Sequence, residues 1–135
     1  GTLNSWKITF NGEKATSAGL AIPDNNATGV TSTATYTQTG TVADVKVSVN
    51  ITHTFKGDLT VSLIAPDNTT VILHNKTGGS TDNVITEYPD LTAPAQALSA
   101  FTGKSIAGGW KLKVVDSAAA DTGTLVSWTL SLTAQ

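Results

Sequence analysis

The sequence contains no cysteine, which excludes disulfide bonds, thiol catalysis and cysteine-ligated zinc. Arginine is also absent, and charged residues make up only 13% of the protein, with a net charge of -2. This balance excludes a strong phosphate-binding surface, so we expect no nucleic-acid partner. No apolar run reaches the roughly 18 residues of a membrane-spanning helix, and the first residues lack a signal-peptide pattern. We therefore expect a soluble, mature fragment with no membrane partner.

Threonine is the most abundant residue, at 24 of 135 positions, and 11 serines accompany it. The length fits one domain with a single core. Threonine is β-branched and favours pleated, half-exposed strands. Low charge combined with many hydroxyl side chains is typical of an extracellular β-domain, so the composition predicts a secreted, all-β protein.

Apolar and polar residues alternate strictly from Val45 to Phe55. A period of two over this length predicts a strand with one buried face and excludes an amphipathic helix. The alternation resumes from Leu59 to Leu63 after Gly57-Asp58, a pair typical of turns, so we expect these two strands to form a hairpin. Residues Val71–His74 are predicted to form a further strand.

Two more strands are predicted near the C-terminus. The first, Trp110–Asp116, has apolar residues on one face and Lys111 and Lys113 on the other, so Asp116 ends an inward-facing row. The second runs from Leu125 to Leu132, and its alternation slips once, as a β-bulge would cause.

No period holds between residues 75 and 109. Glycine pairs and prolines in this stretch predict a long connection, in which only Ala95–Phe101 could form a short helix. Loops of this length usually carry a function or a bound ion.

The first ten residues nearly repeat a segment close to the C-terminus. Gly1–Phe10 and Gly123–Leu132 are identical at five of ten positions, and the apolar positions remain apolar. We predict that residues 1–10 are the last strand of a preceding, similar domain or an accessory strand, and that residues 11–135 are one complete module. The alternative is that the two strands merely look alike.

His53 is the residue that a search for catalysis would select first. It lies in the inward-facing row of the strand Val45–Phe55, whereas a general base must reach a substrate and a nucleophile. We interpret it as a buried structural residue, with Asp58 and Asp116 as its expected hydrogen-bond partners. His74 is expected to be exposed, and two isolated histidines do not make a zinc signature.

Aspartates cluster in the predicted turns. Turn preference explains most of them, but the oxygens of such loops can also bind calcium, which takes about six to eight oxygen ligands. The sequence predicts a calcium site with Asp90, Asp116 and Asp121 as candidate ligands. The alternative is that these residues only cap turns.

Motifs spread over residues 20–133 resemble the P-domain, a module that follows the catalytic domain in kexin- and furin-like proprotein convertases and ends many secreted bacterial proteases. The motifs are Ala21-Ile22-Pro23-Asp24-Asn25, Val45–Ile51, His53-Thr54, Gly57-Asp58-Leu59, Leu63, Pro66, Thr69, Gly109-Trp110-Lys111-Leu112, Asp116, Asp121-x-Gly123-Thr124-Leu125 and Trp128. Two departures stand out. Asn68 replaces a glycine usual in the family, and asparagine tolerates the positive φ of such a turn. A family element with paired aspartates is reduced to Asp90.

The resemblance implies a jelly-roll-like β-sandwich of about eight antiparallel strands. It further implies a non-catalytic module that supports the folding and stability of a linked protease catalytic domain and contacts its protein substrate. The parent would be a secreted bacterial protease, of serine type rather than metallo type, with a neighbouring P-domain. The alternative is a module that anchors the protease to an insoluble protein or polysaccharide, with Tyr36, Tyr88 and Phe101 as exposed aromatic contacts.

Overall fold

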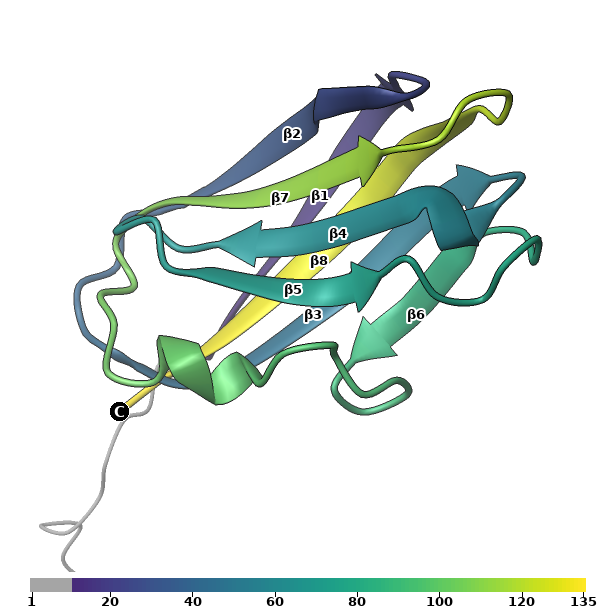
Figure 1. The fold of residues 1–135 in the computed structure, drawn as a ribbon. Coiled ribbons are helices and arrows are strands. Elements are labelled where there is room, and N and C mark those ends of the chain that lie inside the picture. Colours follow the sequence, from purple (N-terminus) through teal and green to yellow (C-terminus); the bar gives the residue numbers. More distant parts are fainter. Residues whose placement is uncertain (1–10) are drawn as a thin grey trace, which may run out of the picture.

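The computed structural model describes residues 11–135, which form eight β-strands and two short 3-10 helices (Figure 1). The strands are β1 (Asn11–Ile22), β2 (Asn26–Tyr36), β3 (Val42–His53), β4 (Leu59–Ile64), β5 (Thr70–Asn75), β6 (Val84–Tyr88), β7 (Gly108–Asp116) and β8 (Gly123–Ala134), and the helices are η1 (Lys56–Asp58) and η2 (Leu98–Phe101). All the strand pairings among these residues are antiparallel. The prediction of an all-β antiparallel fold is confirmed.

The described strands form two four-stranded sheets, with the orders β1-β8-β3-β6 and β2-β7-β4-β5. Successive side chains of a strand point to opposite faces, so every second residue of each sheet faces the other sheet. This is why the period of two in the sequence produces a β-sandwich. The open edges of the two sheets are β1 and β6 in one and β2 and β5 in the other.

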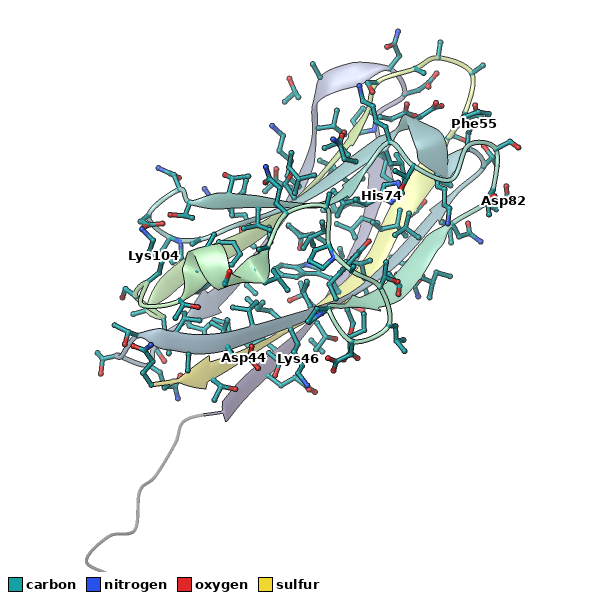
Figure 2. The ribbon with its side chains drawn as sticks, turned by 60° about the horizontal axis from the view of Figure 1, so that its bottom comes forward. Asp44, Lys46, Phe55, His74, Asp82 and Lys104 are labelled. Atoms are coloured by element: carbon teal, nitrogen blue, oxygen red, sulfur yellow. The ribbon has the colours of Figure 1, made fainter. Side chains whose placement is uncertain are left out.

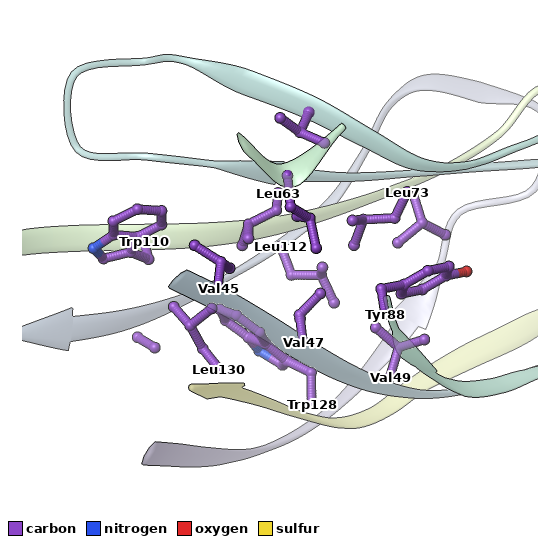
Figure 3. Packing of buried hydrophobic residues seen from close by; sticks show 14 of the residues in the cluster. Val45, Val47, Val49, Leu63, Leu73, Tyr88, Trp110, Leu112, Trp128 and Leu130 are labelled. Atoms are coloured by element: carbon purple, nitrogen blue, oxygen red, sulfur yellow. The ribbon is translucent and has the colours of Figure 1, made fainter. Parts of the chain in front are cut away.

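The core lies between the two sheets and contains Trp110 and Trp128, which are both buried. The indole N–H of Trp110 donates to the carbonyl of Ile106, and that of Trp128 donates to Oγ of Ser32, each at 2.9 Å. Figure 3 shows these tryptophans among the packed side chains, with the alternating valines of β3. Because both indole donors have partners, these large rings add apolar burial without an unsatisfied polar group.

The strands on either side of Gly57-Asp58 do not form the predicted hairpin. β3 pairs with β6 and β8, whereas β4 pairs with β5 and β7 in the other sheet. Residues 56–58 form η1, where the backbone passes from one sheet to the other. The hairpin prediction is wrong because alternation identifies a strand and its buried face but not its neighbour.

The stretch between residues 75 and 109 is not only a connection, because it contains β6. This strand has five residues, pairs with β3 alone among the described strands, and buries Val84 and Tyr88. It is too short to show a clear period. The helix predicted within Ala95–Phe101 is the 3-10 helix η2.

Two local predictions are confirmed. The register of β8 against both neighbours shifts between Leu125 and Ser127, where the slip in alternation predicts a bulge. Asn68 has a φ of 71°, as expected for the turn position that it shares with a glycine in related sequences.

Candidate functional site

His53 and Asp116 form a buried pair between the two sheets. His53 ends β3, Asp116 ends β7, and their relative exposures are 2% and 0%. The distance between Nε2 of His53 and Oδ2 of Asp116 is 2.9 Å. The backbone N–H of Phe55 donates to Nδ1 at 3.1 Å. Because Nδ1 accepts a hydrogen bond, Nε2 carries the ring proton and donates it to the carboxylate.

The rest of the pair is held by backbone groups. Oδ1 of Asp116 accepts from the N–H of Ala118 at 3.1 Å. Gly123 packs directly against the imidazole, since a Cβ there would lie 2.8 Å from Cδ2 of His53 and 2.1 Å from the carbonyl oxygen of Thr52. The glycine is therefore required by close packing, and the imidazole has no space beside it for a substrate.

The chemistry of this arrangement is structural. Both ring nitrogens of His53 are occupied, one by a backbone amide and one by Asp116, and among residues 11–135 no serine or threonine hydroxyl bonds to the ring. A general base needs a nucleophile within hydrogen-bond reach. The pair instead joins β3 of one sheet to β7 of the other.

Asp58 lies beside this pair but does not hydrogen-bond to the imidazole. It sits in η1 and is mostly buried, and its backbone carbonyl accepts from the N–H and the hydroxyl of Ser117 at 3.1 and 3.2 Å. Burial raises the pKa of the Asp58 carboxyl, and the negative charges of Asp116 and Asp121 raise it further. The result is a cluster of like charges at this end of the sandwich.

The three candidate calcium ligands have separate partners. Asp90 forms an ion pair with Lys46 at 2.9 Å, and this hydrogen bond lowers the pKa of Asp90. Asp116 is engaged by His53, and Oδ1 of Asp121 accepts from the hydroxyl of Thr54 at 2.8 Å. Within the described residues, no three His, Cys, Asp or Glu side chains come together as a metal site. These residues do not fit a calcium ion as they are arranged.

His74 is buried, contrary to the prediction that it is exposed, with 8% relative exposure. The register between β4 and β5 slips here, because Val61 pairs with His74 while Ser62 pairs with Ile72. The extra residue, Leu73, lets both it and His74 face inward. Figure 2 shows His74 within the body of the molecule, whereas Asp82 lies at its periphery.

The ring of His74 lines a pocket of about 260 Å³, which we call the His74 pocket. Nε2 of His74 lies 2.9 Å from the carbonyl oxygen of Lys56, so Nε2 carries the proton and donates it. Burial lowers the pKa of His74. Sequence reasoning missed this pocket, because the bulge that turns His74 inward has no signal in the alternation of β5.

A second pocket, of about 390 Å³, lies between the start of β3 and η2, and we call it the η2 pocket. Its lining is largely apolar and includes Val45, Pro89, Pro94 and Leu98. Leu91, between the two prolines, is 78% exposed. Leu91 does not itself line the η2 pocket, but it belongs to the segment whose two prolines do. Exposed apolar side chains near an apolar hollow are typical of an interaction surface.

The aromatic residues expected to be exposed are all buried. The hydroxyl proton of Tyr36 is shared between backbone carbonyls of β1 and β8, each 2.9 Å from the hydroxyl oxygen. Phe101 packs edge-on against Trp110 at 5.2 Å between ring centroids, and Tyr88 is 1% exposed. The polymer-anchoring alternative therefore loses the aromatic contacts on which it rests.

Among residues 11–135 there is no helix long and apolar enough to cross a membrane.

Known proteins resemble this protein in sequence and in fold. The family model described as the proprotein convertase P-domain matches residues 42–132. Leupeptin-inactivating enzyme 1 of Streptomyces exfoliatus is 40% identical over 116 residues, which cover 84% of this chain and 24% of that protein. The calcium-dependent protease of Trichormus variabilis is 41% identical over 97 residues, which cover 70% of this chain and 14% of that protein.

Among solved structures, the Aeromonas sobria serine protease in complex with the chaperone has a TM-score of 0.72 at 20% identity. The match covers 96% of this chain and 27% of that one. At this identity the likeness shows the fold alone. The 135 residues span about a quarter or less of the length of the relatives they match.

Proposed function

The chain belongs to the proprotein convertase P-domain family, and from this premise we propose that it stabilises a protease catalytic domain to which it is linked. P-domains are accessory domains of proteases. The matched region is only 24% and 14% of two relatives, so most of each protein lies outside it. The buried His53–Asp116 pair supports an accessory role, because its side chains are used to join the sheets.

The η2 pocket is the observation that carries this proposal. Asn11, the first described residue, pairs with Thr133, and Thr133 also pairs with Asp44 at the start of β3. The backbone therefore enters the domain on β1, which is separated only by β8 from the pocket-lining start of β3. Figure 1 shows η2 and the C-terminal end together at one end of the sandwich. The segment that precedes Asn11 is therefore tethered at the same end of the sandwich as the η2 pocket, whether it leads directly to a catalytic domain or first to a neighbouring P-domain.

Leu91 offers a direct test with a matched control. In the full-length parent, Leu91→Ser should shorten the half-life of protease activity at elevated temperature, because it removes apolar area from the contact. Ile85 is 61% exposed on the edge strand β6 and lines the His74 pocket, which shares no residue with the η2 pocket, so Ile85→Ser serves as the control. Equal half-lives for the two variants and the unmodified protein would reject this docking surface.

We further propose that the parent is a secreted bacterial protease of the serine type. The two relatives named above are bacterial proteins, and the low charge and many hydroxyl residues of this protein are typical of extracellular domains. We expect phenylmethylsulfonyl fluoride to inhibit the full-length parent if it is of the serine type. Inhibition by 1,10-phenanthroline alone would assign it to the metalloproteases instead.

A neighbouring P-domain is proposed from residues 1–10, which lie outside the described residues. Their sequence matches the first ten residues of β8. In the structure β8 is an inner strand, flanked by β1 and β3. A segment that repeats an inner strand is better explained as the last inner strand of a preceding module than as a strand added to the sheet edge of this module.

Calcium binding stays a prediction, supported by the name of one relative, a calcium-dependent protease. Binding at Asp90, Asp116 and Asp121 would require Lys46 and His53 to be displaced from their partners. This prediction requires a higher melting temperature in calcium than in EDTA, and equal melting temperatures would reject it. A calcium-dependent rise that Asp90→Asn removes would establish the site.

A further inference from the structure

The His74 pocket lies on the side of the sandwich where two edge strands, β5 and β6, face the same space. β5 contributes His74, and β6 contributes four of its five positions, of which Tyr88 is the most buried. Lys56 comes from η1, and Thr77 and Asn83 come from the loop before β6. Groups from four separate segments thus converge on one volume.

Two buried side chains that line this pocket each carry a polar atom with no hydrogen-bond partner among the described residues. Tyr88 is 1% exposed, and its hydroxyl has no hydrogen-bond partner among the described residues. No side-chain nitrogen or oxygen in residues 11–135 is both fully enclosed and unpartnered. The hydroxyl must therefore reach open space, and the pocket that Tyr88 lines is that space. Burial in this position raises the pKa of Tyr88 to about 12, so the hydroxyl keeps its proton and can donate it.

His74 is the second such side chain. Its Nε2 donates to the carbonyl of Lys56 at 2.9 Å, which leaves Nδ1 as a lone pair without a partner in the described residues. Polar groups at buried positions are normally hydrogen-bonded. A tyrosine hydroxyl and an imidazole nitrogen that are both unpaired and line one pocket indicate a ligand or water site.

Two of the remaining lining residues, Asn83 and Lys56, offer hydrogen-bond donors. The side-chain oxygen of Asn83 accepts from the N–H of His53 at 2.9 Å, so its NH₂ group is left to donate. Lys56 has no ion-pair partner among the described residues, and its positive charge helps to lower the pKa of His74. No aspartate or glutamate of the described residues lines the pocket. One cation with hydroxyl and amide donors favours a monoanion. The Nδ1 lone pair of His74 accepts rather than donates, so the same ligand must also carry an N–H group, as a peptide does.

The lysine is held in place by the adjacent loop. The backbone N–H of Lys56 donates to the backbone carbonyl of Thr81 at 3.0 Å. A Cβ on Gly78 would lie 2.2 Å from Cε of Lys56, and Gly78 has a φ of +92°, so the glycine makes room for the lysine stem. The backbone and the stem of Lys56 are therefore in place before any ligand arrives, which reduces the entropy cost of binding.

The volume of the pocket limits the size of the ligand that it can hold. A volume of about 260 Å³ lies below the range of roughly 300–1,000 Å³ typical of drug-sized ligands. It is sufficient for one carboxylate with a short side chain. We propose that the His74 pocket binds a peptide carboxylate, either that of an acidic side chain or the one at a peptide's C-terminus. The pocket shares no lining residue with the η2 pocket, so the two proposals can fail independently.

The test is a titration of the 135-residue protein followed by amide chemical shifts in ¹H–¹⁵N spectra. The probes are N-acetyl-glutamate methylamide, which carries a side-chain carboxylate, N-acetyl-glycine, which carries a terminal one, and N-acetyl-glutamine methylamide, which is neutral. At least one carboxylate should give saturating shifts at Ile85, Thr86 and Tyr88, and the neutral probe should not. The tighter carboxylate identifies the source. The absence of saturable shifts with both carboxylates, or equal binding of the neutral probe, would overturn the proposal.

Two variants tie the binding to the pocket. Tyr88→Phe removes only the hydroxyl and Lys56→Met removes only the charge, and each should weaken carboxylate binding about tenfold or more, as expected for a lost hydrogen bond to a charged group. Lys111→Met, at an exposed lysine of β7, should leave the affinity unchanged. Unchanged affinity in Tyr88→Phe and Lys56→Met would refute the site.

Stability provides a second readout of the unpaired hydroxyl. Because that hydroxyl has no partner within the described residues, Tyr88→Phe should melt at the same temperature as the unmodified protein or higher. A clear drop would show that the hydroxyl has an internal partner, and would contradict the premise on which the site is built.

Discussion

At the scale of single residues, the His53–Asp116 pair is the polar centre of an otherwise apolar interior. The three hydrogen bonds described above satisfy both ring nitrogens of His53 and both oxygens of Asp116. Burying a carboxylate is costly unless it has such partners. The two residues therefore depend on each other, and removal of one leaves the other in an unfavourable environment.

We expect His53→Ala to destabilise the domain by about 3–5 kcal/mol, because it leaves Asp116 buried without its partner. Thr33→Ala, at an exposed position of β2, is the control and should change stability by less than about 0.5 kcal/mol. Urea unfolding followed by tryptophan fluorescence measures both. Similar unfolding midpoints for the two variants would mean that the pair does not stabilise the interior.

His74 should make stability depend on pH. Burial lowers the pKa of His74 from 6.5, and the nearby charge of Lys56 adds to this. The unfolded protein then binds more protons than the folded one in the window below pH 6.5, so stability falls as the pH drops through that window. His74→Asn should flatten this part of the curve. The measurement is the free energy of unfolding as a function of pH, and identical curves for the two proteins would contradict the assignment.

The sequence predicts the interior location of His53 and its proximity to Asp116, since strand parity places both in inward rows. It does not predict the location of His74, because the bulge at Leu73 reverses the parity of the next residue. The sequence also does not predict the partners of Asp90 and Asp121. Their partners, Lys46 in β3 and Thr54 directly after β3, lie far from them along the chain.

At the scale of elements, β8 organises its sheet. It lies between β1 and β3, and its first residue is Gly123, whose missing side chain allows contact with His53. A central strand requires partners on both sides. Because β1 and β3 already flank β8 in the sheets described here, we expect the segment 1–10, which repeats the sequence of β8, to find the corresponding partners in another module.

Deletion of residues 1–10 should therefore leave the melting temperature of the remaining domain essentially unchanged. Calorimetry on the 135-residue protein and on a version that begins at Asn11 measures this. As a control, deletion of residues 123–135, which contain β8, should prevent folding. A large drop in melting temperature on removal of residues 1–10 would show that they are an accessory strand of this module.

Strands can be predicted from the sequence where apolar and polar residues alternate over many positions and one face of the strand is buried. β3, β4, β7 and β8 follow directly from alternation, because each has one fully buried face. β2 also alternates, but its inward residues include Ser32 and Ala34, which are too small or too polar to stand out from threonine. β6 is short, and the partners of each strand are set by long-range packing that a local pattern does not contain.

At the scale of the whole molecule, the sandwich has two chemically different surfaces. The end near η2 carries the apolar η2 pocket and the start of β1, whereas the side between β5 and β6 carries the donor-rich His74 pocket. This separation suits the accessory role that we propose, because one surface can hold a catalytic domain while the other remains open to a peptide. Family membership follows from motifs spread along the sequence, but the positions of these pockets require the structure.

Stabilisation of a linked protease is tested most directly by removing the domain. The measurement is the half-life of protease activity at elevated temperature, together with the yield of folded enzyme, for the full-length parent and for a version without residues 11–135. We predict a shorter half-life and a lower yield for the truncated protease. Equal half-lives and equal yields for the two proteins would contradict a stabilising role.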